Sequence, residues 1–180
     1  MRGQVSRLFG IMAIQKKICM LGATGVGKTS LVRRFVQSIY SEKYHTTIGV
    51  KIDKKLVTFG DTEVNLLLWD LQGEDETFKI RPAFLRGASG YFIVVDLTRH
   101  ETFVTAFSIQ QMVEREVGPL PFLVLFNKND LTEQFEILPN ELENMMQYGW
   151  KMFRTSAKSG ERVEEAFQKL AEKMLKNQTP

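Results

Sequence analysis

The sequence predicts an α/β domain with a mostly parallel, six-stranded sheet that has helices on both faces and one antiparallel strand. Two observations support this prediction. Short apolar runs alternate with amphipathic segments along most of the chain, as in parallel sheets that are covered on both sides. The first apolar run, residues 14–21, is followed directly by a glycine-rich loop and a helix-forming segment. That order is the start of a βα unit, so a local pattern and a chain-wide pattern agree.

The N-terminal half is expected to form one helix and three strands. Residues 14–21 are apolar enough for a buried strand, and a helix is expected after Thr29, running to about residue 38. The stretch 39–49 is polar and non-periodic, and it is long for a simple connection, so we expect a loop with a function of its own. The next two strands are expected to form a hairpin around the turn Gly60-Asp61-Thr62, at 50–59 and 63–69.

The C-terminal half continues the alternation of strands and helices. Its first two strands are almost wholly apolar, and its last helix is amphipathic. The expected elements are a short helix near 82–87, strands at 90–96, 122–126 and 151–155, and helices at 101–116, 139–148 and 163–176. Because no linker or repeat divides them, residues 14–177 are expected to form one domain.

The bulk properties favour a globular, monomeric, cytoplasmic protein. Hydrophobic residues make up 43% of the chain, and its 24 basic and 21 acidic residues are dispersed, so we expect no nucleic-acid-binding segment. The single cysteine, Cys19, excludes an internal disulfide and fits a reducing compartment. Residues 1–13 are expected to be a flexible leader, with Met12 as an alternative start, and residues 178–180 a short tail.

Residues 22–29 match the phosphate-binding loop G-x-x-x-x-G-K-[ST]. The glycines allow backbone N–H groups to converge on a phosphate, and the following helix adds the positive end of its dipole. Lys28 is expected to reach the β- and γ-phosphates, and Thr29 to place its hydroxyl on Mg²⁺. A chance glycine-rich turn is the alternative, but the flanking strand and helix favour a P-loop NTPase. The expected phosphate contacts are Ala23, Thr24, Gly25, Val26, Gly27, Lys28, Thr29 and Ser30.

Two further motifs follow expected strands. Asp70 comes directly after the strand 63–69, at the carboxyl end where open α/β sheets bind ligands, and is suited to hold a metal. Asn127-Lys128-Asn129-Asp130 comes directly after the strand 122–126. With these motifs in this order, the chain resembles the small GTPases of the Ras superfamily over residues 14–177.

The ungapped run from 47 to 96 is most similar to the Rab branch of that superfamily. The resemblance implies a small G-domain that binds GTP or GDP with Mg²⁺. It also implies a switch protein that hydrolyses GTP slowly, through positioning and the electrostatic effect of the metal.

The resemblance implies a guanine site made of two loops. Asp130 would accept guanine N1–H and the 2-amino group, and adenine would leave this carboxylate unpaired. Asn127 and Lys128 would support the first loop and cover the base. The second loop is matched by Ser156-Ala157-Lys158, in which the Ala157 N–H would meet guanine O6 and Lys158 would pack near the base.

The resemblance also implies the residues around the γ-phosphate. Thr47 would ligate Mg²⁺ and sense the γ-phosphate, Asp70 would hold Mg²⁺ through water, and the Gly73 N–H would bond the γ-phosphate. These loops would be ordered by the triphosphate and released on hydrolysis. The implied metal ligands are Thr29, Thr47 and Asp70, and the implied catalytic residues are Lys28, Thr47, Gly73 and Glu74.

Several aromatic and apolar positions bear on ligands and partners. Tyr40 falls where the family places an aromatic against the guanine edge, and Tyr44 where one closes over the phosphates, although both would also suit loop packing. Ile52 stands where Rab proteins carry an effector-facing phenylalanine, while Trp69 and Phe84 remain. We therefore expect an effector, an exchange factor and a GTPase-activating protein at the switch loops. No cysteine lies near the end, so no lipid anchor is expected in this chain.

The segment after Asp70 departs from the family. Glu74 replaces the glutamine that orients the attacking water, and Gln72 replaces a smaller alanine beside Gly73. Glu74 could act as a general base, slow the reaction through its negative charge, or be a solvated residue whose task has passed to Gln72. Thr24 replaces a glycine of the Ras branch, but Rab proteins commonly carry a small hydroxyl residue there.

Three functional readings follow. The first is a GTP/GDP switch with slow hydrolysis. The second is a GTP-binding interaction module in which Glu74 and Gln72 have abolished hydrolysis; it shares every binding residue with the first. The third, a P-loop kinase acting on a small substrate, is disfavoured because Asn127 to Asp130 and Ser156 to Lys158 build a guanine site.

Overall fold

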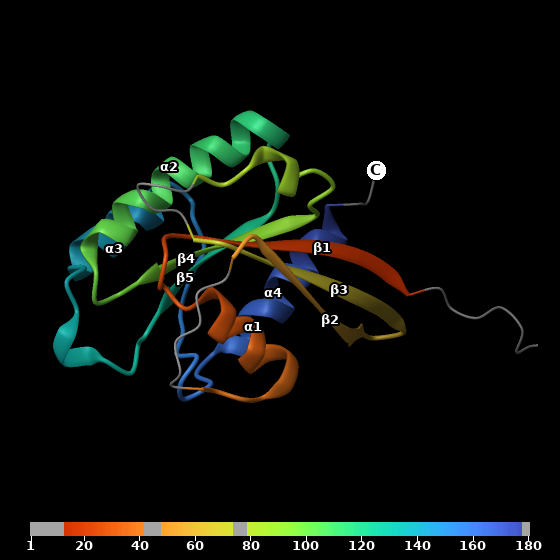
Figure 1. The fold of residues 1–180 in the computed structure, drawn as a ribbon, viewed down its shortest axis with the longest axis horizontal. Helices are drawn as coiled ribbons and strands as arrows, with labels where there is room; N and C mark the ends of the chain where they lie inside the picture. Colours follow the sequence, from red (N-terminus) through yellow and green to blue (C-terminus); the bar gives the residue numbers. More distant parts are fainter. Residues whose placement is uncertain (1–12, 42–47, 74–78, 178–180) are drawn as a thin grey trace, which may run out of the picture.

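The computed structural model describes residues 13–41, 48–73 and 79–177, which form one sheet with helices on both faces (Figure 1). The six strands lie side by side in the order β2-β3-β1-β4-β5-β6. Among the described strands, β2 and β3 pair in antiparallel fashion and the other neighbours pair in parallel. The predicted fold class is therefore confirmed. The strand bounds are β1 Ile14–Leu21, β2 Val50–Phe59, β3 Thr62–Leu71, β4 Gly90–Asp96, β5 Phe122–Asn127 and β6 Met152–Arg154.

The helices form two layers on opposite faces of the sheet. Figure 1 shows α1 (Lys28–Gln37) and α4 (Val163–Lys176) together on one face, and α2 (His100–Val117) and α3 (Pro139–Gln147) on the other. Successive side chains of a strand point to opposite faces, so both faces of a central strand are buried in an apolar core. The described residues also include the 3-10 helices η1 (Pro82–Phe84) and η2 (Thr132–Gln134), and η2 was not predicted.

Several elements differ in their bounds from the prediction, β3, β6 and α1 among them. β3 extends to Leu71, because β2 pairs with it as far as that residue and β1 pairs with it as far as Asp70. Asp70 thus lies inside the strand instead of after it. β6 has only three residues. Helix α1 begins at Lys28, before the expected start after Thr29, and ends at Gln37, one residue before the expected end.

The core between the sheet and the α1–α4 layer is centred on three phenylalanines. The ring of Phe167 on α4 stacks on Phe35 of α1, with centroids 4.1 Å apart and planes 9° apart. Its other neighbour is Phe92 of β4, at 4.7 Å between centroids. All three rings are buried. They join two helices that are far apart in the chain to the middle of the sheet.

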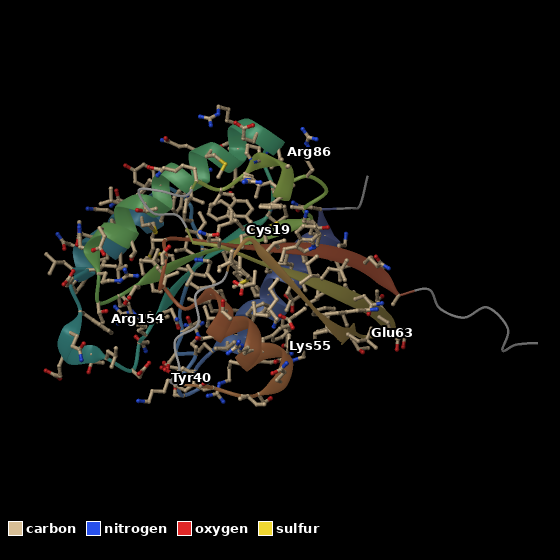
Figure 2. All side chains as sticks on the ribbon, viewed as in Figure 1. Cys19, Tyr40, Lys55, Glu63, Arg86 and Arg154 are labelled. Carbon is tan, nitrogen blue, oxygen red and sulfur yellow. The ribbon has the colours of Figure 1, made fainter. Side chains whose placement is uncertain are left out.

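The single cysteine belongs to the opposite core. Cys19, labelled in Figure 2, is fully buried on β1. Its thiol donates to the carbonyl of Phe84 at 3.6 Å. Burial raises the pKa of this thiol to about 11. It therefore stays protonated at neutral pH, which makes it an apolar core residue and a poor nucleophile.

The sequence predicted a leader, a tail and no membrane anchor. The leader, apart from residue 13, and the tail lie outside the described residues. Within the described residues, every helix is too short or too polar to cross a bilayer.

Replacing Phe167 with alanine should destabilise the fold by about 3–5 kcal/mol, because it removes both ring contacts and leaves a cavity between α1, α4 and β4. Urea unfolding followed by circular dichroism measures this loss. Val104, which is 56% exposed on α2, supplies the control: Val104→Ala should change stability by less than about 0.5 kcal/mol. A Phe167→Ala cost no larger than that of the control would contradict this description of the core.

Candidate nucleotide-binding site

The predicted site residues gather at one edge of the sheet. β1, β3, β4 and β5 run in the same direction, so their carboxyl ends lie along one edge, where α1 also begins (Figure 1). The phosphate-binding loop follows β1, the Asn127 motif follows β5, and the loop with Ala157 follows β6. Open α/β sheets bind their ligands at this edge.

Two glycines of the phosphate-binding loop are required by close contacts with neighbouring segments. Gly27, at the N-terminal cap of α1, has φ +101°, and a Cβ there would lie 2.2 Å from Nδ2 of Asn127. Gly22 has φ +142°, and a Cβ there would lie 2.4 Å from the carbonyl oxygen of Val94. The loop therefore presents its main chain, followed by the positive end of α1, which is the arrangement that binds phosphate. Ser30 lies in the first turn of that helix.

Lys28 lies back across the same loop. Its ammonium donates to the carbonyl of Gly22 at 3.0 Å and to that of Ala23 at 2.9 Å, and the residue is 6% exposed. A buried ammonium requires hydrogen-bond acceptors around it, and these two carbonyl oxygens supply them. These contacts hold the positive charge over the loop, where the sequence predicted a phosphate contact.

Thr29 and Asp70 bring two oxygen groups together beside the loop. The Thr29 hydroxyl donates to Oδ2 of Asp70 at 2.5 Å, and Asp70 is fully buried. Hydroxyl and carboxylate oxygens are ligands that Mg²⁺ accepts, and Mg²⁺ normally uses few protein ligands beside phosphate and water. Among the described residues there is no cluster of three or more His, Cys, Asp or Glu side chains that could hold a metal alone. The donor set thus fits a phosphate-bound Mg²⁺.

Asn127 joins the phosphate-binding loop to the second guanine loop. Its Nδ2 donates to the carbonyl of Val26 at 2.9 Å, and its Oδ1 accepts the N–H of Ala157 at 3.2 Å. The residue is 2% exposed. The sequence assigned Asn127 to supporting its own loop, whereas here it contacts two other segments. The Ala157 N–H, expected to meet guanine O6, is directed at Asn127.

Asp130 is held by Ser156. The Ser156 hydroxyl donates to Oδ1 of Asp130 at 2.5 Å, and in turn accepts the N–H of Ser159 at 3.0 Å. Ser156 is fully buried, whereas Asp130 is exposed. A carboxylate fixed in this way, with one face towards solvent, is suited to accept hydrogen bonds from a base.

Lys128 contacts a buried acid that the sequence analysis did not assign to the site. Its ammonium lies 2.5 Å from Oδ2 of Asp96, and Arg99 donates to the same oxygen at 2.9 Å. Burial opposes ionisation of Asp96, but hydrogen bonds from Lys128, Thr98 and Arg99 outweigh it and hold the pKa of this carboxyl below its ordinary value. Arg99 also donates to the carbonyl of Thr24 at 2.8 Å.

This network links the Asn127 motif to the phosphate-binding loop a second time. The available sequence signal was the position of Asp96 at the end of a buried strand, and β4 and β5 pair it directly with Asn127. An acid at the end of a buried strand beside a known motif is a candidate for the site.

Arg34 is a second residue that sequence reasoning missed. From α1 its Nε donates to the carbonyl of Ala157 at 2.8 Å, and its guanidinium also donates to the carbonyl of Lys158. Lys158 itself is exposed. The helix that begins at the phosphate-binding loop therefore also holds the loop of Ala157.

Gly73 lies against the phosphate-binding loop. The Thr24 hydroxyl donates to the carbonyl of Gly73 at 3.1 Å, and a Cβ at Gly73 would lie 2.5 Å from Cα of Thr24. Only glycine permits this approach. Tyr40 follows α1 and is labelled in Figure 2. Its side chain is 36% exposed, and its contact with the base stays a prediction. Three predicted site residues lie outside the described residues: Tyr44, Thr47 and Glu74.

Comparison with known proteins shows which family this chain resembles. Residues 17–176 match the model of the Ras family. The human Ras-related protein Rab-32 is 32% identical over 171 residues, which cover 89% of this chain and 75% of the relative. The human Ras-related protein Rab-31 is 34% identical over 161 residues, with 88% and 83% covered. Rab-32A of Dictyostelium discoideum is 34% identical over 173 residues, with 89% and 78% covered.

The family match and these identities extend over nearly the whole domain, and they agree with the phosphate-binding loop, the Asn127 motif and the sheet order. The chain belongs to the Ras family and is a Rab-like small GTP-binding switch protein of the Ras superfamily.

Proposed function

We propose that this protein is a GTP/GDP switch that binds guanine nucleotide with Mg²⁺, hydrolyses GTP slowly, and acts as a monomer in the cytoplasm. The observation that carries the proposal is the Asn127 side chain, which contacts the phosphate-binding loop and the loop of Ala157 at once. A phosphate site and a base site that share one buried side chain suit a single nucleotide spanning both.

The residues divide the work of binding. The main chain of the phosphate-binding loop and the Lys28 ammonium receive the phosphates. Asp130, held by Ser156, accepts the donors of guanine. Thr29 and Asp70 would hold Mg²⁺, which when bound offsets the negative charge on the β- and γ-phosphates. Gly73 lies beside the loop, and its N–H would donate to the γ-phosphate.

A second candidate, the GTP-binding module without hydrolysis, is favoured by the Glu74 and Gln72 replacements. Oε1 of Gln72 accepts the N–H of Gly49 at 3.1 Å. Because this oxygen is used inside the fold, we do not assign Gln72 to orienting the attacking water. The choice between the two candidates therefore rests on Glu74.

We also propose that effectors and regulators contact the segments that flank Gly49 and Gly73, together with the β2–β3 surface beside them. Ile52 is 51% exposed on β2 and pairs with Trp69 of β3. Lys17 lies over the Trp69 ring, with its ammonium 3.6 Å from the centroid. An exposed apolar side chain beside a cation over an aromatic ring suits a partner that is mostly apolar with a polar rim.

Substituting Asp130 with alanine should lower the affinity for GDP by about 100-fold, because two hydrogen bonds from the base to a charged acceptor are lost. Fluorescence titration with labelled GDP and ADP measures the change, and the affinity for ADP should stay the same. Asn129, whose side chain bonds Glu161, gives the matched control: Asn129→Ala should leave both affinities within about threefold. Equal affinity of the unmodified chain for GDP and ADP would refute the guanine site.

Exchanging Glu74 for glutamine should raise the single-turnover rate of GTP hydrolysis about tenfold, equivalent to about 1.4 kcal/mol of barrier. The substitution removes the negative charge that follows Gly73 and supplies the amide with which the family orients water. The unmodified chain should still hydrolyse its bound GTP within hours. Glu133→Gln, in η2, is the matched control and should have no effect.

If GTP stays intact in the unmodified chain and glutamine restores hydrolysis, the interaction module is the correct function. If neither protein hydrolyses GTP in the presence of Mg²⁺, the proposal of an intrinsic GTPase fails.

A further inference from the structure

The hydrogen bonds between Gly49 and Gln72 depart from a regular β-ladder. β2 and β3 pair up to Val50 and Leu71, and Gly49 and Gln72 are the next opposed residues. The Gln72 N–H donates to the carbonyl of Gly49 at 2.9 Å. The Gly49 N–H donates to Oε1 of the Gln72 side chain at 3.1 Å. A regular antiparallel pair of this kind exchanges two main-chain hydrogen bonds.

The side chain of Gln72 thus occupies the position of its own main-chain carbonyl in the ladder. The chain can turn away from β2 after Leu71 and still keep the second hydrogen bond to Gly49. The next residue, Gly73, lies against the phosphate-binding loop, where its carbonyl accepts the Thr24 hydroxyl at 3.1 Å. Gln72 therefore stands between two contacts, one to the start of β2 and one to the phosphate-binding loop.

The length and chemistry of glutamine are both needed for this bond. The alanine that the resemblance expects at this position has no acceptor beyond Cβ. Methionine has a similar length but only a weak acceptor, whereas glutamate keeps an oxygen where glutamine has Oε1. Without the bond, the Gly49 N–H would have to find water or the main-chain carbonyl of residue 72, which would move Gly73.

We propose that Gln72 is a positioning residue that ties the start of β2 to Gly73 and thereby favours binding of the triphosphate over the diphosphate. This inference rests on the proposed function, in which the Gly73 N–H contacts the γ-phosphate that GDP lacks. Ordering Gly73 before the ligand binds reduces the conformational entropy that binding would cost. The effect is confined to the ligand that Gly73 contacts, so GDP should be insensitive to it.

The nucleotide test compares unmodified protein with Gln72→Met in the presence of Mg²⁺. We expect the affinity for a non-hydrolysable GTP analogue to fall about fivefold relative to the affinity for GDP, corresponding to one net hydrogen bond. The affinity for GDP itself should stay within about twofold. An unchanged ratio, or an equal fall in both affinities, would overturn the proposal, since a general structural defect would weaken both.

A second measurement tests the hydrogen bond itself and does not depend on nucleotide affinities. Amide hydrogen exchange at Gly49, followed by NMR, should be at least about fivefold faster in Gln72→Met than in the unmodified chain. In Gln72→Glu the amide should stay protected, because the carboxylate oxygen still accepts the N–H. Equal exchange in all three proteins would overturn the hydrogen bond itself. Failure of the unmodified chain to bind guanine nucleotide would instead contradict the proposed function, and the two failures are therefore distinguishable.

Discussion

The hydrogen bonds of Asn127 are the contacts on which the rest of the site depends. The side chain donates to Val26 in the phosphate-binding loop and accepts from Ala157, residues 101 and 30 positions away in the chain. It is buried, so a lost partner would leave a polar group without water to replace it. Gly27 must be glycine because this amide lies where a Cβ would be. One asparagine thus fixes both the shape of the phosphate-binding loop and its distance from the base loop.

The parallel sheet explains why these groups meet. Its strands end at one edge, where Asp96 lies beside Asn127 and Asp70 lies on the other side of β1, and α1 starts at the same edge. The buried carboxylate of Asp96 accepts hydrogen bonds from Lys128 and Arg99, and these bonds lower its pKa. Its stabilising contribution is therefore present above the ordinary aspartate pKa and is lost as the pH falls through the lowered value. The same network stabilises the fold and holds the loops that contact the ligand.

The sequence predicted the elements and motifs because their signals are local. Apolar runs placed β4 and β5, and the glycine spacing placed the phosphate-binding loop, within a residue or two of the structure. Arg34 and Arg99 were missed because their partners lie 123 and 75 residues away and no periodicity marks them. The length of β3 depended on its two neighbours, and the bond from Gly49 to Gln72 depends on where β3 ends. Contacts set by the packing of distant segments were thus invisible in the pattern of the chain.

The most direct test of this account is the rate at which labelled GDP dissociates from Asn127→Ala compared with the unmodified chain. If one buried side chain joins the phosphate and base halves of the site, its loss should speed dissociation by about 100-fold, equivalent to about 3 kcal/mol, while cooperative unfolding is retained. Dissociation within about twofold of the unmodified rate, in a protein that still folds, would mean that the two halves hold their positions independently and would contradict the account.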